Sequence, residues 1–573
     1  MVVNKLENVN QKPWISQYPD QIPTSITTKI EPLPNYLKQT SKEFPHKKAL
    51  NFLGKDVSFH EIYVQALRFA NYLKNLGIKK GDRVSIMLPN CPQAVVAYYG
   101  ILYAEAIVVQ TNPLYTEREL EYQMDDSGAK VIICLDLLIN RVNAVKDATN
   151  LEHIIVTSVK DYLPIIKKLL YPFSKQPKAP EIPSKNYIHK FNYIMKISAP
   201  IEINLDHVSV DEVAILQYTG GTTGFPKGVM LTHKNLVSNT LMCEYWLYKS
   251  KKGKEVILSV LPFFHVYGMT ACMNLSIICA YKMILVPRFD AGLMLESIKK
   301  YRPTLFPGAP TMYIALINHP DLPKYDLSSI EACISGSSAL PLEVQERFEK
   351  ITGGKLVEGY GLSEASPVTH GNFLWDKRIN GSIGVPWPDT DAKIISMETG
   401  EEVPIGEIGE LVVSGPQVMK GYWKRPEETA ATLKDGWLYT GDLGYMNEDG
   451  YFFIVDRKKD MIIASGYNVY PREIEEILYE HEAIQETVVI GVPDPYRGET
   501  VKAFIVLKEG KHVTESEVNE FCRKYLAPYK VPRQFEFRNE LPKTAIGKIL
   551  RRQLVEEEKQ KQVKDENQDE KLS

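Results

Sequence analysis

The strongest chemical signal in the sequence is a loop of glycine and hydroxyl residues at positions 218–228, directly after the apolar run at 213–217. Glycines let the backbone bend sharply and bring N–H groups close to an anion. The threonines and lysine add donors, and no carboxylate is present to repel phosphate. The pattern predicts a triphosphate site rather than a simple glycine turn. It is not a Walker A loop, because Lys227 precedes a glycine. The predicted contacts are Thr219, Gly220, Gly221, Thr222, Thr223, Gly224 and Lys227.

Two further segments place carboxylates in glycine-containing bends. In residues 357–364, Glu364 can reach a hard cation, because Mg²⁺ prefers oxygen ligands and phosphates. Taken alone, Glu364 could equally be a solvated loop acid. In residues 439–442, Asp442 can accept hydrogen bonds from two adjacent hydroxyl groups, and Arg457 can add a ribose or phosphate contact. Small residues at 335–339 suit the close approach of a flat base or an acyl chain, although an ordinary turn would look similar.

A lysine and a histidine complete the set of candidate chemical groups. Lys548 lies on a glycine-bent loop, residues 541–549, where one positive charge can stand beside a developing oxyanion. His265 lies in residues 256–281, a stretch with no Asp, Glu, Lys or Arg. A lone histidine among apolar residues is more often a core residue. The stretch is long enough for a membrane span, but Pro262 would interrupt a helix. A buried strand, a loop and a core helix are favoured instead.

The elements that position these groups follow a recognisable order. Strand-like and helical runs alternate over residues 35–165 and again from about 210 to 370, which predicts an α/β fold of βα-layered, mostly parallel sheets. From about 380 to 455 short strands and turns predict a small β-barrel-like subdomain. The predicted N-terminal domain therefore spans residues 1–455. A hinge at 456–460, a small mobile α+β domain at 461–555 and a frayed charged tail at 556–573 complete the chain.

Composition limits the classes of function. The 573 residues are 44% hydrophobic and 24% charged, with a net charge of −3, which argues against a dedicated nucleic-acid binder. Seven cysteines, with no CxxC pair, make a disulfide framework or a structural zinc site unlikely. The polar N-terminus lacks the apolar core of a signal peptide. These features predict a reducing, cytoplasmic location.

A basic segment at residues 160–198 interrupts the alternating pattern. It holds eight lysines and two acidic residues, and three prolines spaced three apart favour an extended stretch. Before the prolines, residues 163–173 mix lysines with bulky apolar side chains. A loop that contacts an anionic membrane surface, on the inner face of the cell membrane, and a solvated insertion both fit this composition.

In their order along the chain, these motifs resemble those of the adenylate-forming superfamily, which includes acyl-CoA synthetases, luciferases and the adenylation domains of peptide synthetases. The resemblance runs from about residue 35 to 555 and is greatest to bacterial long-chain fatty-acid–CoA ligases. It implies ATP-dependent ligation of a long-chain fatty acid to coenzyme A through an acyl-adenylate, with AMP and pyrophosphate as the other products. ATP, Mg²⁺ and coenzyme A are the implied ligands.

The resemblance also implies roles for single residues. Thr222 and Glu364 would hold Mg²⁺, Tyr360 would lie against the adenine, and Asp442 would bind the ribose. Lys548 would contact the carboxylate and the α-phosphate, and His265 would lie beside the acyl carboxylate. The hinge would centre on Lys459, and Gly466 would let the pantetheine arm of coenzyme A pass. The remaining implied nucleotide contacts are Gly336, Ser337, Glu358, Gly359, Gly361, Ser363 and Arg457.

Several alternatives stay open at this point. The absence of an acid in residues 256–281 favours an uncharged acyl chain over an amino acid. A medium-chain or aryl acid–CoA ligase, a luciferase-type oxidation and a non-catalytic membrane-associated fatty-acid carrier all remain as competing hypotheses. The acyl chain length and whether the chain forms a homodimer are also open.

Overall fold

The largest sheet lies in the N-terminal half of the protein. The computed structural model describes residues 12–170, 178–219, 226–464, 467–494, 498–544 and 547–572. In the described residues this sheet has eight strands in the order β18-β9-β8-β4-β3-β5-β6-β7, with β3 to β8 parallel and β9 and β18 antiparallel at one edge. The strands are β3 (Arg83–Met87), β4 (Ile107–Gln110), β5 (Ala129–Leu135), β6 (His153–Thr157), β7 (Ile188–Lys190), β8 (Val213–Thr219), β9 (Lys227–Thr232) and β18 (Gly421–Tyr422).

Helices pack around this sheet, so its strands are nearly continuous apolar runs. All residues of α4 are buried, and a Cβ at Gly100 in α4 would come within 2.9 Å of the Ala66 carbonyl in α3, so the two helices touch closely. The N-terminal end of α3 is fixed by a capping box between Ser58 and Glu61. The helices of this half are α2 (Leu33–Glu43), α3 (Phe59–Asn75), α4 (Pro92–Tyr103), α5 (Glu117–Ser127), α6 (Ile139–Val145), α7 (Ile165–Leu170), α8 (Phe191–Ile197) and α9 (His233–Trp246).

Two four-stranded sheets form the second layer and are joined by bridges of Leu305 to Ile257 and to Ala332. Their orders are β10-β11-β1-β2 and β12-β13-β14-β15. Helices α12 (Ala291–Tyr301), α13 (Pro310–Ile317) and α14 (Leu342–Thr352) belong to this layer. The strands are β1 (Lys48–Phe52), β2 (Lys55–Ser58), β10 (Val256–Ser259), β11 (Lys282–Leu285), β12 (Ala332–Ser335), β13 (Lys355–Gly361), β14 (Val368–Gly371) and β15 (Val385–Pro386).

The uncharged stretch at 256–281 forms a strand, a loop and a buried helix, as the break at Pro262 predicts. Strand β10 is followed by α10 (Val266–Gly268), a π-helical segment η6 (Met269–Asn274) and α11 (Leu275–Ile278). Every residue of η6 is buried. Among the residues that the structure describes, no helix has both the length and the apolar character needed to cross a membrane.

A small antiparallel sheet follows, as expected for the β-rich subdomain. Its order is β16-β17-β20-β19, and β21 pairs with β20. The segment 447–450 makes the turn between β20 and β21, where Gly450 has φ 82°. The elements are β16 (Asp391–Ile395), β17 (Gly409–Ser414), α15 (Pro426–Thr432), β19 (Leu433–Lys434), β20 (Trp437–Met446) and β21 (Phe452–Arg457).

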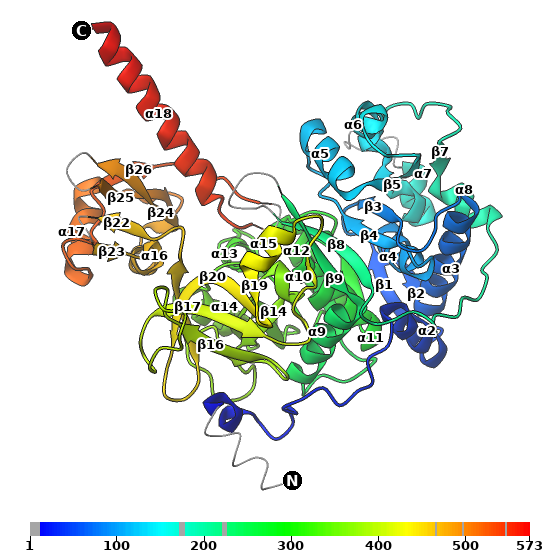
Figure 1. Cartoon of the computed structure of the whole chain (residues 1–573), viewed down its shortest axis with the longest axis horizontal. Helices are drawn as coiled ribbons and strands as arrows, with labels where there is room; N and C mark the ends of the chain where they lie inside the picture. Colours follow the sequence, from blue (N-terminus) through cyan, green and yellow to red (C-terminus); the bar gives the residue numbers. More distant parts are fainter. Residues whose placement is uncertain are drawn as a thin grey trace.

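The C-terminal domain is a separate body with its own apolar core around Ile474, Val489 and Ile505. Figure 1 shows it to one side of the large domain, with the last helix projecting away from both. The α/β class with a smaller C-terminal domain is thus confirmed. Its elements are β22 (Ile462–Ala464), β23 (Tyr467–Val469), α16 (Pro471–Tyr479), β24 (Ile484–Asp494), β25 (Gly498–Leu507), α17 (Glu515–Tyr525), β26 (Gln534–Phe537) and α18 (Arg551–Leu572).

The prediction of a frayed tail after residue 555 was wrong. Helix α18 continues to Leu572, and its composition of Glu, Lys and Gln favours a helix. Leu554 is fully buried, and Glu558 pairs with Lys502 at 2.7 Å. Helix propensity and these tertiary contacts outweigh the charge density that suggested disorder.

Candidate functional site

The predicted triphosphate loop is a connection between two paired strands. Thr219 at the end of β8 lies opposite Lys227 at the start of β9 in the antiparallel register. Strand pairing therefore fixes both ends of the loop. Five predicted contacts, Gly220, Gly221, Thr222, Thr223 and Gly224, lie outside the described residues.

Glu364 lies near one end of that loop. The Tyr422 hydroxyl donates to Glu364 Oε1 at 2.7 Å, and the Lys227 ammonium lies 5.3 Å from the centre of the Tyr422 ring. Tyr422 is in β18, which pairs with β9, so the sheet edge brings these groups together. Ser363 begins the short helix that carries Glu364. One carboxylate beside a phosphate loop suits Mg²⁺, which takes much of its coordination from phosphates and water.

Asp442 is at the centre of a second group of polar side chains. The Tyr360 hydroxyl donates to Asp442 Oδ2, and Arg457 Nε lies 3.2 Å from Asp442 Oδ1. Asp442 and Arg457 are opposite one another in the pairing of β20 with β21. Burial raises the pKa of Tyr360 well above its ordinary value, and the Asp442 charge adds to the shift, so its hydroxyl remains a donor. Asp442 is thus held between the Tyr360 hydroxyl and the Arg457 guanidinium, one partner on each carboxylate oxygen.

In the glycine- and serine-containing segments 335–339 and 357–364, the backbone packs closely against neighbouring residues. A Cβ at Gly336 would lie 3.1 Å from the Tyr267 ring, and one at Gly359 would lie 2.9 Å from Ile334. A Cβ at Gly361 would overlap the Pro367 carbonyl, at 2.2 Å. Ser337 adopts φ 75°, in the left-handed region. These tight contacts hold two turns of the large domain against the wall of a cavity described below.

His265 caps the short helix α10. Its Nδ1 accepts a hydrogen bond from the Tyr267 N–H at 3.3 Å. Burial lowers the pKa of His265 to about 4, and the charge of Lys548 lowers it further. His265 is therefore neutral near pH 7, and because Nδ1 is the acceptor, the assigned tautomer leaves an Nε2–H donor.

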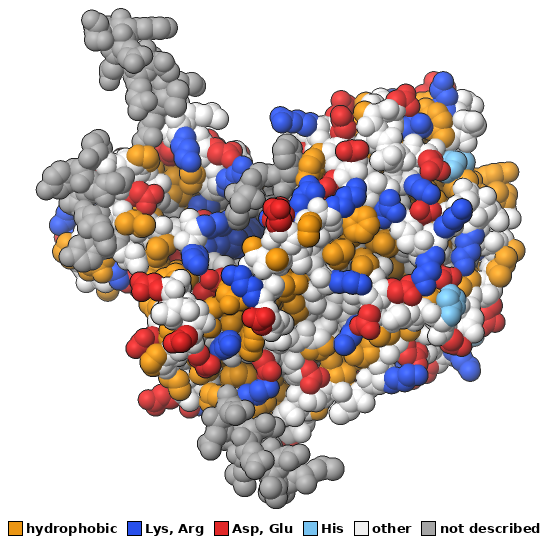
Figure 2. Space-filling model, in the orientation of Figure 1, with side chains coloured by type: hydrophobic (Ala, Val, Ile, Leu, Met, Phe, Trp, Pro, Cys, Tyr) orange, Lys and Arg blue, Asp and Glu red, His pale blue; other side chains and the backbone are white. Residues whose placement is uncertain are grey.

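Lys548 reaches this region from the C-terminal domain. Its loop turns at Gly547, which has φ 80°, and the Thr544 N–H donates to the Lys548 carbonyl at 2.8 Å. A Cβ at Gly547 would come within 2.1 Å of Thr311 Oγ1 in α13, so the loop touches the large domain. Figure 2 shows Lys and Arg side chains gathered in the hollow between the two domains.

The pKa of Lys548 is unusually low for a lysine. Burial lowers its pKa to about 8, and Arg457, Lys459 and Arg551 lower it further, whereas Asp442 opposes the shift. Within the described part of the chain, its ammonium group has no carboxylate partner within salt-bridge distance. The structure thus brings together Lys548, His265 and the Asp442 group, which are far apart in sequence. A cation of this kind is suited to an incoming anion.

Glu358, a predicted nucleotide contact, has a different setting. Its Oε2 accepts the Leu340 N–H at 3.1 Å, and its Oε1 lies 3.5 Å from Arg472 Nη2. Arg472 belongs to α16, so this ion pair crosses between the two domains. Burial raises the pKa of Glu358 to about 7, although Arg472 opposes the shift.

The predicted hinge lies in a turn between β21 and β22. Lys459 is exposed in this turn, and Gly466 lies outside the described residues. Asp456, just before the turn, accepts the Arg472 N–H at 2.9 Å. Arg551 lies 3.6 Å from Asp456 and 3.2 Å from Asp460 and also pairs with Glu475. Sequence reasoning missed both arginines, because no local motif links them to residues 75 to 115 positions away.

Removal of the cross-domain pair is expected to change one half-reaction. Arg472→Ala leaves Glu358 buried without its partner, so the arrangement with Lys548 in the cleft is destabilised. We expect adenylate formation to slow about tenfold, equivalent to about 1.4 kcal/mol, while thioester formation from supplied acyl-adenylate is retained. Rapid-quench assays of each half-reaction measure this. Arg523→Ala, on the exposed side of α17, is the control. Equal slowing of both half-reactions would contradict the assignment.

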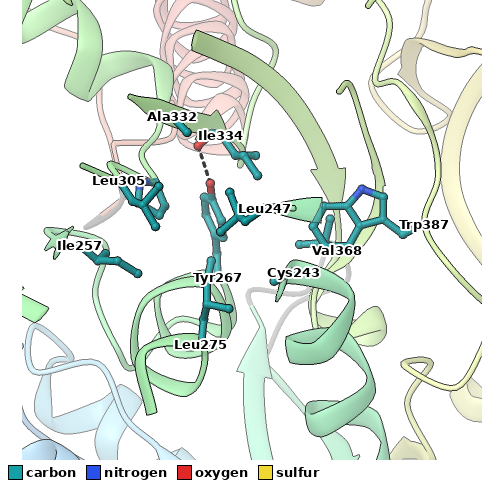
Figure 3. A pocket seen from close by; sticks show the side chains of 12 residues that line it. Cys243, Leu247, Ile257, Tyr267, Leu275, Leu305, Ala332, Ile334, Val368 and Trp387 are labelled. Carbon is teal, nitrogen blue, oxygen red and sulfur yellow. Dashed lines mark hydrogen bonds between the residues drawn. The ribbon is translucent and has the colours of Figure 1, made fainter. Parts of the chain in front are cut away.

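An apolar cavity lies beside Tyr267 (Figure 3). Its volume is about 30 Å³, and it lies between α9, β10, η6, β12 and β14. The Tyr267 hydroxyl donates to the Ile334 carbonyl at 2.6 Å, and this bond holds the ring along the cavity wall. This volume holds one or two water-sized molecules, so a longer acyl chain would enter only if the lining side chains moved apart. The lining residues are Cys243, Leu247, Ile257, Tyr267, Ala271, Leu275, Leu305, Pro307, Ala332, Ile334, Val368 and Trp387.

Comparison with known protein families identifies the class. The family described as AMP-binding enzyme matches residues 37–423, and the AMP-binding enzyme C-terminal domain matches residues 473–548. The chain belongs to the AMP-binding enzyme family. It is 58% identical over 551 residues to a long-chain-fatty-acid–CoA ligase from Bacillus subtilis (strain 168), covering 96% of this chain and 98% of that protein. A ligase of the same name from Escherichia coli O6:H1 is 40% identical, with 96% and 98% covered.

Solved structures show the same arrangement. An anthranilate CoA ligase, AuaEII, in complex with anthranoyl-AMP has a TM-score of 0.84 at 28% identity and covers 95% of this chain and 100% of its own. ATP-bound MatB from Rhodopseudomonas palustris has a TM-score of 0.80 at 29% identity, with 91% and 98% covered. These likenesses extend over both domains.

Proposed function

We propose that this protein is a long-chain fatty-acid–CoA ligase that uses ATP, Mg²⁺ and coenzyme A and forms acyl-CoA, AMP and pyrophosphate. The observation that carries the proposal is the meeting of three features. Lys548 from the C-terminal domain lies near both His265 and the Asp442 group, and Tyr267, which is hydrogen-bonded to His265, lines the apolar cavity. Two relatives that are long-chain-fatty-acid–CoA ligases, and that match this chain over nearly their whole length, support the same proposal.

In the adenylation step, the fatty carboxylate attacks the α-phosphorus of ATP and pyrophosphate leaves. Asp442 would accept hydrogen bonds from the ribose hydroxyls, and the loop from Thr219 to Lys227 would bind the phosphates. Lys548 would offset the negative charge that gathers between carboxylate and α-phosphate. Neutral His265 would donate its Nε2–H to the carboxylate. Binding and charge neutralisation supply the catalysis, because the substrate brings its own nucleophile.

Glu364 and Thr222 are the proposed ligands of Mg²⁺. When bound, the ion would neutralise phosphate charge and fix the triphosphate. The acyl chain would extend into the cavity past Tyr267. Its lining carries no charged side chain, so an alkyl chain is the chemistry that it fits.

The thioester step needs a different arrangement of the domains. The thiol of coenzyme A attacks the acyl-adenylate carbonyl and AMP leaves, so Lys548 must make room. We propose that the C-terminal domain swivels at residues 456–460, with Lys459 at the pivot and Gly466 beside the pantetheine arm. The ion pairs of Arg551 and Arg472 with Asp456, Asp460 and Glu358 would then break or exchange.

A direct assay tests the proposed function. Purified protein is given ATP, Mg²⁺, coenzyme A and a series of carboxylic acids from hexanoate to oleate, with benzoate as the aryl candidate. We expect AMP and pyrophosphate to form only with an acid, and the acyl-CoA yield to peak with long chains. A peak at medium chains or benzoate would instead identify a medium-chain or aryl acid–CoA ligase. Release of no pyrophosphate with any acid would favour a non-catalytic carrier instead.

We also propose that the ligase contacts an anionic membrane, where its amphipathic substrate collects. The basic and apolar residues within 160–198 are the reason. The surface involved is argued below.

A further inference from the structure

Helix α7 turns its apolar face outward. Ile165, Ile166, Leu169 and Leu170 are 80%, 72%, 70% and 59% exposed. On a helix of 3.6 residues per turn they fall within an arc of about 140°, with the helix's two lysines on the other side. Surface helices of globular proteins usually bury this face. Nothing in the described chain covers it, because no residue of α7 is buried.

On the opposite side of α7, the end of one exposed lysine contacts the protein. Lys167 Nζ donates to the Leu53 carbonyl at 2.8 Å, in the turn between β1 and β2. A Cβ at Gly54 in the same turn would lie 3.6 Å from Pro164, just before the helix. These contacts orient α7 with its four apolar side chains toward solvent.

Helix α8 also exposes apolar side chains on one face. Phe191 and Ile194 are buried against α3, whereas Tyr193 and Ile197, four residues apart on one face, are 58% and 53% exposed. The four apolar residues of α7 with Tyr193 and Ile197 are called the α7–α8 surface below.

Helix α8 and a residue shortly before α7 are hydrogen-bonded to α3. Gln65 accepts from the Tyr162 hydroxyl, just before α7, and Arg68 donates to the Met195 carbonyl in α8. Asn71 Nδ2 donates to the Ala199 carbonyl at 3.1 Å. These bonds place α8 and the chain just before α7 beside α3. Figure 1 shows them at the same end of the molecule, and Figure 2 shows hydrophobic and basic side chains mixed over the region of α8.

The segments that carry the α7–α8 surface are rich in lysine. The described residues 160–170 and 178–201 carry seven lysines against Asp161 and Glu181, a net charge of +5 in a protein with a net charge of −3. All seven lysines are exposed. They are Lys160, Lys167, Lys168, Lys178, Lys185, Lys190 and Lys196. Apolar side chains for the acyl boundary and lysines for headgroup phosphates are what an anionic bilayer surface requires.

We propose that the α7–α8 surface docks the protein on anionic lipid bilayers. This inference rests on the proposed function, because a membrane is where a long-chain fatty acid is held. A protein partner would need a polar rim and shaped pockets, whereas these side chains protrude from short helices in segments with a net charge of +5. The docking is peripheral and reversible, and salt weakens it by screening the lysines.

Vesicle co-sedimentation with the full chain tests this. Wild-type protein is expected to bind vesicles that contain phosphatidylglycerol, to bind pure phosphatidylcholine vesicles weakly, and to be released by high salt. Ile166→Glu/Leu169→Glu is expected to lower the bound fraction about tenfold. The control is Ile405→Glu/Ile408→Glu, in the β-rich subdomain, where the two side chains are 52% and 43% exposed. Its binding should equal that of wild type.

The outcomes separate docking from catalysis. In both double variants, AMP formation with a soluble short acid should match wild type, and the thermal midpoint should be unchanged because no buried side chain is altered. Equal binding of the α7 variant and wild type, or equal loss in the control variant, would overturn the proposal. If the wild type binds vesicles but forms no AMP with any acid, the docking proposal is supported and the proposed ligase activity is rejected. A third variant, Lys168→Glu/Lys196→Glu, should lose binding to anionic vesicles but keep the weak binding to pure phosphatidylcholine vesicles.

Discussion

Replacement of Lys548 by alanine is expected to slow acyl-adenylate formation by about 10²- to 10³-fold, the usual cost of one preorganised charge at a reacting centre. The lysine enters the cleft from the C-terminal domain and has no carboxylate partner among the described residues, so no neighbour replaces its charge. Thioester formation from supplied acyl-adenylate should stay within about threefold of wild type. Pyrophosphate release and acyl-CoA formation are measured separately in single-turnover experiments.

A neighbouring lysine provides the control. Lys543 lies on the same loop but pairs with Glu486 of its own domain at 2.6 Å. Lys543→Ala should therefore leave adenylation nearly unchanged. Equal loss of both half-reactions in Lys548→Ala would refute the division of labour between the two steps.

The pH dependence of adenylation follows from the same lysine. Its pKa is lowered to about 8, so the charged form predominates below that pH and is lost as the pH rises through it. The kcat/KM for ATP should therefore fall on the alkaline side of about 8, and this fall should be absent in Lys548→Ala. His265, with its pKa lowered to about 4, stays neutral throughout this range.

The second large effect is expected in the acyl cavity. Ala271→Phe places a ring in the space lined by Leu275 and Leu305. If about four methylenes lose their site at about 0.8 kcal/mol each, the activity with palmitate falls by about 10²-fold. Hexanoate should react nearly as before, because a short chain does not reach the added ring. Competition assays with mixed acids measure the change in kcat/KM.

A graded series sharpens this test. Ala271→Val adds less volume and should reduce palmitate activity by an intermediate amount. Equal loss with both acids would mean that the ring distorts the site itself rather than shortening the cavity. Unchanged palmitate activity in Ala271→Phe would place the acyl chain somewhere else.

The parts of the site that could be predicted are those built within short segments. Thr219 and Lys227 border a loop that strand pairing closes, and Asp442 and Arg457 face each other across one hairpin. The uncharged stretch around His265 also indicated burial correctly. In each case the feature follows from a short segment of sequence, because the loop, the hairpin or the buried run is formed by neighbouring residues.

The parts that could not be predicted depend on how distant segments meet. The pair of Glu358 with Arg472 exists because two domains lie in one particular orientation, which no local pattern encodes. The same holds for Arg551 and its three carboxylate partners. The cavity beside Tyr267 is assembled from helices and strands spread over residues 243–387, so its volume is a property of packing. Helix α18 was missed because charge density was weighed above helix propensity and Leu554 packing.

The long last helix would make the proposed domain swivel observable. At 1.5 Å per residue, the 22 residues of α18 extend about 33 Å. Glu557 and Glu558 clamp its first turns to Arg538 and Lys502, so the rod turns with its domain. A turn of only about 30° would carry the far tip through about 17 Å. With one fluorophore near that tip and another on the large domain, the efficiency of energy transfer would change each time the C-terminal domain changed orientation during turnover.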